Sequence, residues 1–156
     1  MKKEFELAQA LKPLASLLGK WGFEGHIKHK PGIKIKGRET YEPLDGGHFI
    51  LLRWDVVIIW EKGKKEVNSG LMVIGYDSEM KTFTGSWFDN SGANNKYEIG
   101  IENNVLIIAT KGHRFTGTFS KDKKTITGKW EHSGGGGYTY SYDKILTKAQ
   151  TKNTIQ

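Results

Sequence analysis

Two stretches near the C-terminal end decide the fold prediction: Phe115-Thr116-Gly117-Thr118-Phe119 and Ile126-Thr127-Gly128-Lys129-Trp130. An earlier stretch, Phe83-Thr84-Gly85-Ser86-Trp87, repeats their pattern. Because side chains of a β-strand alternate between its two faces, each copy places a large apolar residue, a glycine and an aromatic residue on one face. Glycine inside a strand weakens it and is typical of a bend, a bulge or a close approach. The three copies therefore predict a sheet that curves around something.

The chain after Gly19 consists of short strand-like runs separated by turn signals. Such spacing favours an all-β sandwich or barrel, and a series of consecutive hairpins favours an antiparallel up-and-down barrel. About ten strands are predicted, over residues 20–29, 33–42, 48–60, 65–76, 82–89, 96–102, 105–111, 114–120, 125–132 and 138–146.

A short helical segment is predicted at the N-terminus, within residues 1–18. Its apolar residues recur mostly every three or four positions, at Phe5, Leu7, Leu11, Leu14 and Leu18. Pro13 is expected to break or kink this helix. The length of 156 residues predicts one domain over 1–156, and the polar residues 148–156 are expected to form a flexible tail.

The loop lengths predict how the last strands pair. A four-residue loop at 121–124 sets Gly117 beside Gly128, with Phe119 opposite Ile126 and Phe115 opposite Trp130. A loop at 133–137 sets Trp130 opposite Tyr140 and Gly128 opposite Tyr142. The two glycines then form a notch under aromatic rings, which is either a bend in the wall or a pocket.

The pair Asn103-Asn104 predicts a type I′ turn, because asparagine tolerates the positive φ angles that this turn requires. The turn sets Ile101 opposite Leu106 and Ile99 opposite Ile108.

The chain carries 24 Lys plus Arg against 17 Asp plus Glu, a net charge of +7. Most of the lysines fall in predicted turns, where charge is usually only solvated, so no nucleic-acid partner is predicted. The basic first hairpin, over residues 28–38, remains a candidate anion-binding surface. The chain has no cysteine, its N-terminus is a poor signal peptide, and no apolar run is long enough for a membrane span. A cytoplasmic protein is therefore expected.

Several stretches resemble a bacterial family of unknown function with a lipocalin-like, calycin-type barrel, the domain of unknown function of the 1579 type. The matching stretches are Leu17-Leu18-Gly19-Lys20-Trp21, Gly47-His48-Phe49, Arg53-Trp54-Asp55, Val73-Ile74-Gly75-Tyr76-Asp77 and the two glycine stretches near the C-terminus. The resemblance implies a fold and no reaction. The Gly19-x-Trp21 start is also similar to that of haem-carrying, nitrobindin-like barrels.

Arg53 and Asp55 are the first candidate site residues. They share one face of the predicted strand 48–60, whereas Trp54 faces the other way, and both faces of this strand are apolar. Charges on a strand that is buried on both faces need a partner or a polar ligand. Either the two residues have protein partners, or Arg53 binds an anionic group inside the barrel.

An aromatic cluster is the second candidate. The predicted pairing brings together Trp87, Phe115, Gly117, Gly128, Trp130, Tyr140 and Tyr142. These residues either fill the core of the barrel or line a cavity in it. His132 lies on the same face, where it is either exposed or available as a haem ligand or a base.

The sequence predicts no catalytic or metal site and no cofactor. His26 and His29 point to opposite faces of a strand, and no paired carboxylates or catalytic triad can be defined. Three functions stay open. The first is a non-catalytic barrel that binds a small hydrophobic or amphipathic molecule in its lumen. The second is a structural or interaction protein with a filled core that forms a homodimer. The third is a haem-binding, nitrobindin-like barrel.

Overall fold

The computed structural model describes residues 6–27, 30–133 and 139–149, and the side chains of Ser133 and residues 139–145 lie outside this description. The described part contains two short 3₁₀ helices, η1 (Gln9–Leu17) and η2 (Glu61–Gly63). It also contains ten strands: β1 (Gly19–Ile27), β2 (Lys30–Pro43), β3 (Ile50–Ile59), β4 (Lys65–Asp77), β5 (Thr82–Asp89), β6 (Asn94–Glu102), β7 (Val105–Thr110), β8 (His113–Phe119), β9 (Thr125–Ser133) and β10 (Thr139–Lys148).

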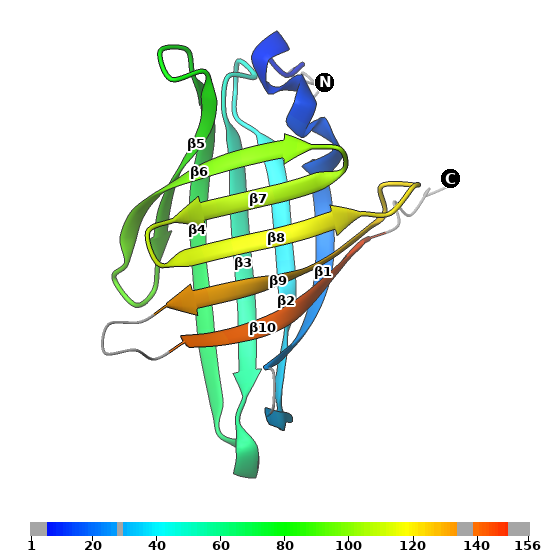
Figure 1. Cartoon of the computed structure of the whole chain (residues 1–156), viewed down its shortest axis with the longest axis vertical. Coiled ribbons are helices and arrows are strands. Elements are labelled where there is room, and N and C mark those ends of the chain that lie inside the picture. The colour runs from blue at the N-terminus through cyan, green and yellow to red at the C-terminus, as the bar shows by residue number, and fades with distance from the viewer. Residues whose placement is uncertain (1–5, 28–29, 134–138, 150–156) are drawn as a thin grey trace, which may run out of the picture.

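The ten described strands form one closed antiparallel barrel in up-and-down order, and β1 pairs with β10 to close it. This confirms the predicted fold class. Strands β1 to β4 run along the long axis of the molecule in Figure 1, and β7 to β10 cross in front of them. Within the described residues, no helix is long and apolar enough to cross a membrane.

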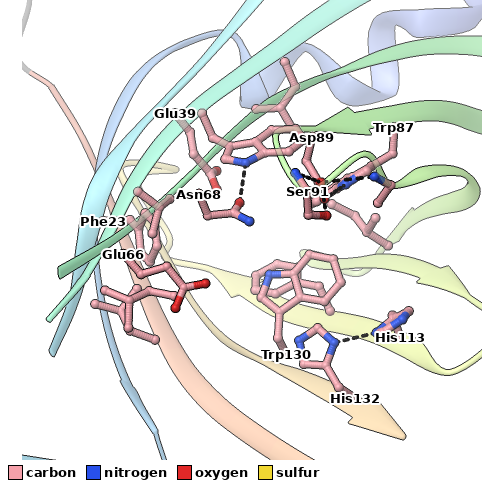
Figure 2. A pocket seen from close by; sticks show the side chains of 18 of the residues that line it. Phe23, Glu39, Glu66, Asn68, Trp87, Asp89, Ser91, His113, Trp130 and His132 are labelled. Atoms are coloured by element: carbon pink, nitrogen blue, oxygen red, sulfur yellow. Dashed lines mark hydrogen bonds between the residues drawn. The ribbon is translucent and has the colours of Figure 1, made fainter. Parts of the chain in front are cut away.

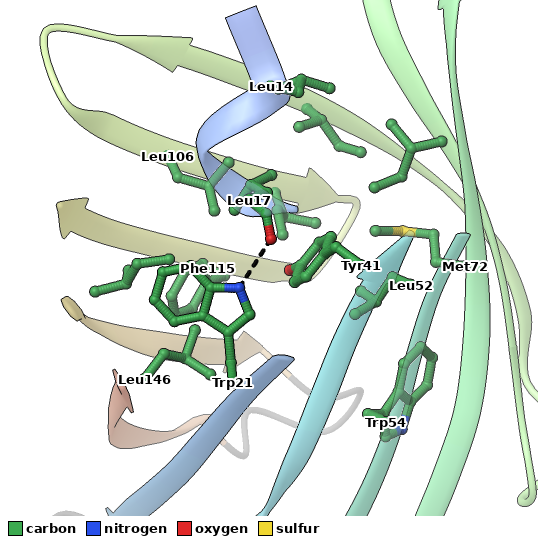
Figure 3. Packing of buried hydrophobic residues seen from close by; sticks show 14 of the residues in the cluster. Leu14, Leu17, Trp21, Tyr41, Leu52, Trp54, Met72, Leu106, Phe115 and Leu146 are labelled. Carbon is green, nitrogen blue, oxygen red and sulfur yellow. Dashed lines mark hydrogen bonds between the residues drawn. The ribbon is translucent and has the colours of Figure 1, made fainter. Parts of the chain in front are cut away.

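The helix η1 covers one end of the barrel, at the top of Figure 1. Its leucines Leu11, Leu14 and Leu17 are buried in the hydrophobic core. The Trp21 indole N–H donates to the Leu17 carbonyl at 2.8 Å, as Figure 3 shows, and so ties the helix to β1. Pro13 lies inside η1, which continues past it to Leu17 as a 3₁₀ helix, so the chain does not break there.

Most of the fully buried side chains lie at this same end, which we call the closed end. They come from η1 and from the strand halves nearest to it, and include Trp21, Ile50, Met72, Ile74, Ile99, Leu106 and Ile126. Large apolar side chains from nearly every wall meet there (Figure 3). This half of the barrel is therefore filled by its own residues.

The predicted pairings of β6 to β9 are confirmed. Asn103 and Asn104 both have positive φ angles, 51° and 65°, as a type I′ turn requires, and Ile101 pairs with Leu106. Gly117 pairs with Gly128, with Phe115 opposite Trp130.

The predicted pairing of β9 with β10 is wrong by two residues. Tyr142 lies opposite Trp130, and Tyr140 lies opposite His132. The reason is that β9 continues to Ser133, which pairs with Thr139, so the connection begins one residue later than the sequence suggested. A shift of two keeps the faces unchanged, because side chains alternate with a period of two.

Candidate functional site in the barrel lumen

A cavity of about 840 Å³ occupies the half of the barrel away from η1. Its lining includes the exposed residues Lys30, Glu66 and Ser91, so the cavity opens to solvent there. We call this half the open end. The apolar side chains of its wall are Phe23, Ile27, Ile35, Leu52, Trp54, Val56, Ile58, Trp60, Trp87, Ala93, Ile108, Phe115, Trp130 and Leu146.

Aromatic rings form a continuous arc along this wall. The ring of Trp87 lies at the centre, 4.1 Å from the Trp54 ring and 5.0 Å from the Tyr97 ring, measured between centroids. Trp130 follows at 6.0 Å from Trp87, and Phe115 lies 5.5 Å beyond it. The arc joins strands β3, β5, β6, β8 and β9, so residues far apart in sequence share one aromatic surface.

Hydrogen bonds fix three of the indole rings. Trp54 donates its N–H to Asn68 Oδ1 at 2.8 Å, and Trp60 donates to Glu66 Oε2 at 2.9 Å. Trp87 donates to Asp89 Oδ2 at 3.0 Å (Figure 2). Each bond gives an indole N–H its partner and fixes the orientation of a ring in the wall.

Asp89 is held as a carboxylate at the edge of the cavity. Its Oδ1 accepts from the Ser91 hydroxyl at 2.5 Å and from the Ser91 and Ala93 backbone N–H groups. Partial burial opposes the charged form, but the hydrogen bonds from Ser91, Trp87 and Ala93 outweigh it and lower the pKa of Asp89. Burial, together with the Asp89 charge, raises the pKa of Tyr97 to about 12. At neutral pH the site therefore has an anionic Asp89 beside a neutral phenol.

A second acidic residue, Glu39 on β2, lies deeper in the cavity wall and is 6% exposed. Burial and the nearby Glu39 raise the pKa of Tyr41 well above its ordinary value, so Tyr41 stays neutral. Glu39 has interactions of its own within the protein.

His113 and His132 face each other across β8 and β9 at the open end (Figure 2). Their Nδ1 atoms are 2.5 Å apart, and the His132 ring stacks on Trp130 with 5.7 Å between centroids. Burial, with a smaller effect of His113, lowers the pKa of His132 to about 4. His132 is therefore uncharged near neutral pH.

These two histidines are the lining residues whose imidazoles could ligate a metal ion or a haem iron. Among the side chains that the structure describes, no group of three or more His, Asp or Glu residues could hold a metal ion. The described site offers aromatic contact, hydrogen-bonding groups and the negative charge of Asp89.

The structure brings Trp87, Phe115 and Trp130 together in the cavity wall. Gly117 and Gly128 lie beside them but not in the lining. A methyl group on Gly117 would come within 2.7 Å of the Phe115 ring, and one on Gly128 within 3.0 Å of it. The glycine notch is therefore occupied by Phe115 and is not an open pocket.

Arg53 and Asp55 lie on the outer face of β3, away from the cavity. The Arg53 side chain is 61% exposed, and its Nε lies 4.0 Å from Glu42 Oε1. Trp54 instead points inward, so an anchoring role for Arg53 inside the barrel does not fit its position. Tyr140 and Tyr142 pair through their backbones as given above, but their side chains lie outside the described ones.

Sequence reasoning missed several lining residues, among them Trp54, Asn68, Asp89, Tyr97 and His113. Trp54 and Arg53 point to opposite faces of β3. Because both faces of this strand are apolar in sequence, the pattern did not show which face points inward. In the structure Gly70 lies opposite Trp54, and a side chain there would collide with the Trp54 ring.

The chain belongs to the family described as "Protein of unknown function (DUF1579)", which matches residues 8–145. This confirms the family resemblance. No curated protein matches the sequence.

Two solved structures share the fold. Rv2717c from M. tuberculosis is 15% identical with a TM-score of 0.65, over 93% of this chain and 100% of that one. The S-type phycobiliprotein lyase CPES from Guillardia theta is 10% identical with a TM-score of 0.55, over 90% and 93% of the two chains. The zebrafish ileal bile acid-binding protein complexed with cholic acid is 12% identical, over 86% and 99%, with a TM-score of 0.41. At these identities the likeness concerns the barrel and not the ligand.

Proposed function

We propose that this protein is a non-catalytic carrier or binding protein that takes a small hydrophobic or amphipathic molecule into the open end of its barrel. The observation that carries the proposal is the cavity of about 840 Å³ with its aromatic wall. Small-molecule sites are concave, mostly apolar and about 300–1,000 Å³ in volume, with a few polar groups that orient the ligand. The fixed indoles favour binding further, because a wall that is already ordered loses little entropy when a ligand enters.

Two neighbouring residues on β3 provide the test. Val56 lines the cavity, and Val57, the next residue, lies on the outer face. The probe is N-phenyl-1-naphthylamine, a neutral fluorophore that brightens in apolar sites. We expect the wild type to bind it and Val56→Phe to weaken binding at least tenfold, because the larger ring occupies cavity volume. Val57→Phe is the matched control and should bind as the wild type does. Equal binding by all three proteins, or no binding at all, would contradict the proposal.

A homodimer is the second candidate, and an apolar patch on the outer face of β3 to β5 favours it. There Val67 is 56% exposed and Phe88 is 44% exposed, and their cross-strand neighbours are Val57 and Leu71. Exposed patches of this kind often mark interaction surfaces. Light scattering at several concentrations should show a dimer that Val67→Asp dissociates. A strict monomer at all concentrations contradicts this candidate.

The haem alternative stays a prediction. Adding haem to the purified protein and recording the Soret band tests it, with His132→Ala as the variant that should remove the band.

A further inference from the structure

We propose that the cavity selects molecules that carry a positively charged head group, such as an ammonium group on an apolar, planar body. This inference rests on the proposed lumen binding and names the ligand class. Its basis is a repeated arrangement at the open end: an aromatic ring whose N–H is bound to a carboxylate. Trp87 with Asp89 is one case, and Trp60 with Glu66 is the other.

The geometry of these pairs suits an organic cation. An indole N–H donates from the edge of the ring, so the hydrogen bond itself leaves the ring faces uncovered. The Trp54 and Tyr97 rings already pack against Trp87, at 4.1 and 5.0 Å between centroids. The ring face offered to a cation is therefore mainly that of Trp60, which lines the cavity beside Glu66. The faces of tryptophan attract cations within about 6 Å, by about 0.5–2 kcal/mol, depending on exposure. A carboxylate beside the same ring adds a full negative charge. A cation at the open end therefore meets both favourable groups at once.

The charged side chains of the described lining also favour a cation. At the open end these are the acidic residues Asp89 and Glu66 and the basic residue Lys30, a ratio of two to one, and no arginine is in the described lining. Glu39 interacts within the protein, so the inference uses only the two carboxylates at the open end. His132 contributes no positive charge near neutral pH, because its pKa lies at about 4. An anionic head group would thus meet unfavourable charge here.

The protein as a whole carries a net positive charge. Lys62, Lys64 and Lys65 lie at the turn that connects β3 with β4. All three side chains are exposed. Charges in solvent are screened over about 8 Å at physiological salt, whereas charges in a partly buried wall are screened much less. The partly buried Asp89 therefore contributes most to the selectivity, whereas the exposed Glu66 and the exposed lysines are screened to a similar extent.

The experiment compares three competitors that share one ring system: 1-naphthylmethylammonium, 1-naphthalenemethanol and 1-naphthylacetate. Each displaces N-phenyl-1-naphthylamine from the protein at pH 7.5 and 0.15 M salt. We expect the ammonium compound to bind at least tenfold more tightly than the acetate, with the alcohol between them. Asp89→Asn and Glu66→Gln should each weaken ammonium binding about three- to tenfold and leave alcohol binding within twofold. Glu24→Gln, an exposed acid on β1, is the matched control and should change nothing.

The outcomes separate the two proposals. Equal affinities, or a preference for the acetate, overturn the cation inference while lumen binding stands. If none of the three compounds and not even the probe binds, the proposed function fails and the inference with it. The order of the three affinities is measured on the wild type and needs no variant. If Asp89→Asn fails to fold, Glu66→Gln still provides the test, because Glu66 is exposed.

Discussion

The two ends of this barrel are built from the same kinds of residue and differ in what fills them. At the closed end, η1 inserts three leucines between the walls, and the side chains there are almost completely buried. At the open end the same strands continue without a plug, and a cavity of about 840 Å³ remains. The difference shows that η1 and its leucines fill one half of the barrel, whereas the other half keeps a cavity that is available for binding.

Tryptophan shows the contrast most clearly. Trp21 at the closed end is buried and uses its N–H to hold η1 in place. Trp54 and Trp87 at the open end use their N–H groups to fix rings that face a cavity. One residue type thus serves packing at one end and a binding surface at the other.

The largest effect is expected from truncations on β7, where one strand passes through both ends. Leu106 is fully buried at the closed end, and Ile108, two residues later, lines the cavity. Leu106→Ala should lower the free energy of unfolding by about 3 kcal/mol, because it leaves an empty space in a packed region. Ile108→Ala should cost about half as much, because one side of Ile108 already faces the cavity. Urea denaturation measures both, and equal losses would contradict the contrast.

The glycine notch should tolerate even a methyl group poorly. Gly117→Ala pushes against Phe115 and Ile126 and should cost about 1–3 kcal/mol of unfolding free energy. Gly100 on β6 has open space around it, so Gly100→Ala is the matched control and should be neutral or slightly stabilising. If Gly117→Ala is as stable as Gly100→Ala, then Phe115 does not occupy the notch.

The open end should also make the protein sensitive to acid. His132 has a pKa of about 4 in the folded protein, against an ordinary value of 6.5. Between these values the unfolded chain binds more protons, so the free energy of unfolding falls as the pH drops from about 6.5 to 4. His132 is only half-buried, so we expect a loss of about 1–2 kcal/mol. Denaturation at pH 7 and pH 4.5 measures it. His132→Gln should reduce the loss, and the exposed His26→Gln should leave it unchanged.

The sequence predicted the barrel well because local signals specify it. Strand alternation, turn residues and the three glycine stretches all indicate the same fold, and short loops such as Asn103-Asn104 determine the register. The site was harder to predict. β3 is apolar on both faces, so alternation alone could not tell whether Arg53 or Trp54 points inward. The pairing of His113 with His132 and the role of Asp89 depend on contacts between distant strands, which no local pattern reveals.

The most direct test of the account uses the indole N–H signals of the tryptophans, five in the whole chain. The protein is labelled with ¹⁵N, and 1-naphthylmethylammonium is titrated in while the signals are followed by NMR. We predict that the signals of Trp54 and Trp87 move as the compound binds, and that the signal of Trp21 at the closed end stays in place. Movement of Trp21 to the same extent, or no movement of Trp54 and Trp87 at saturation, would contradict a binding site confined to the open end.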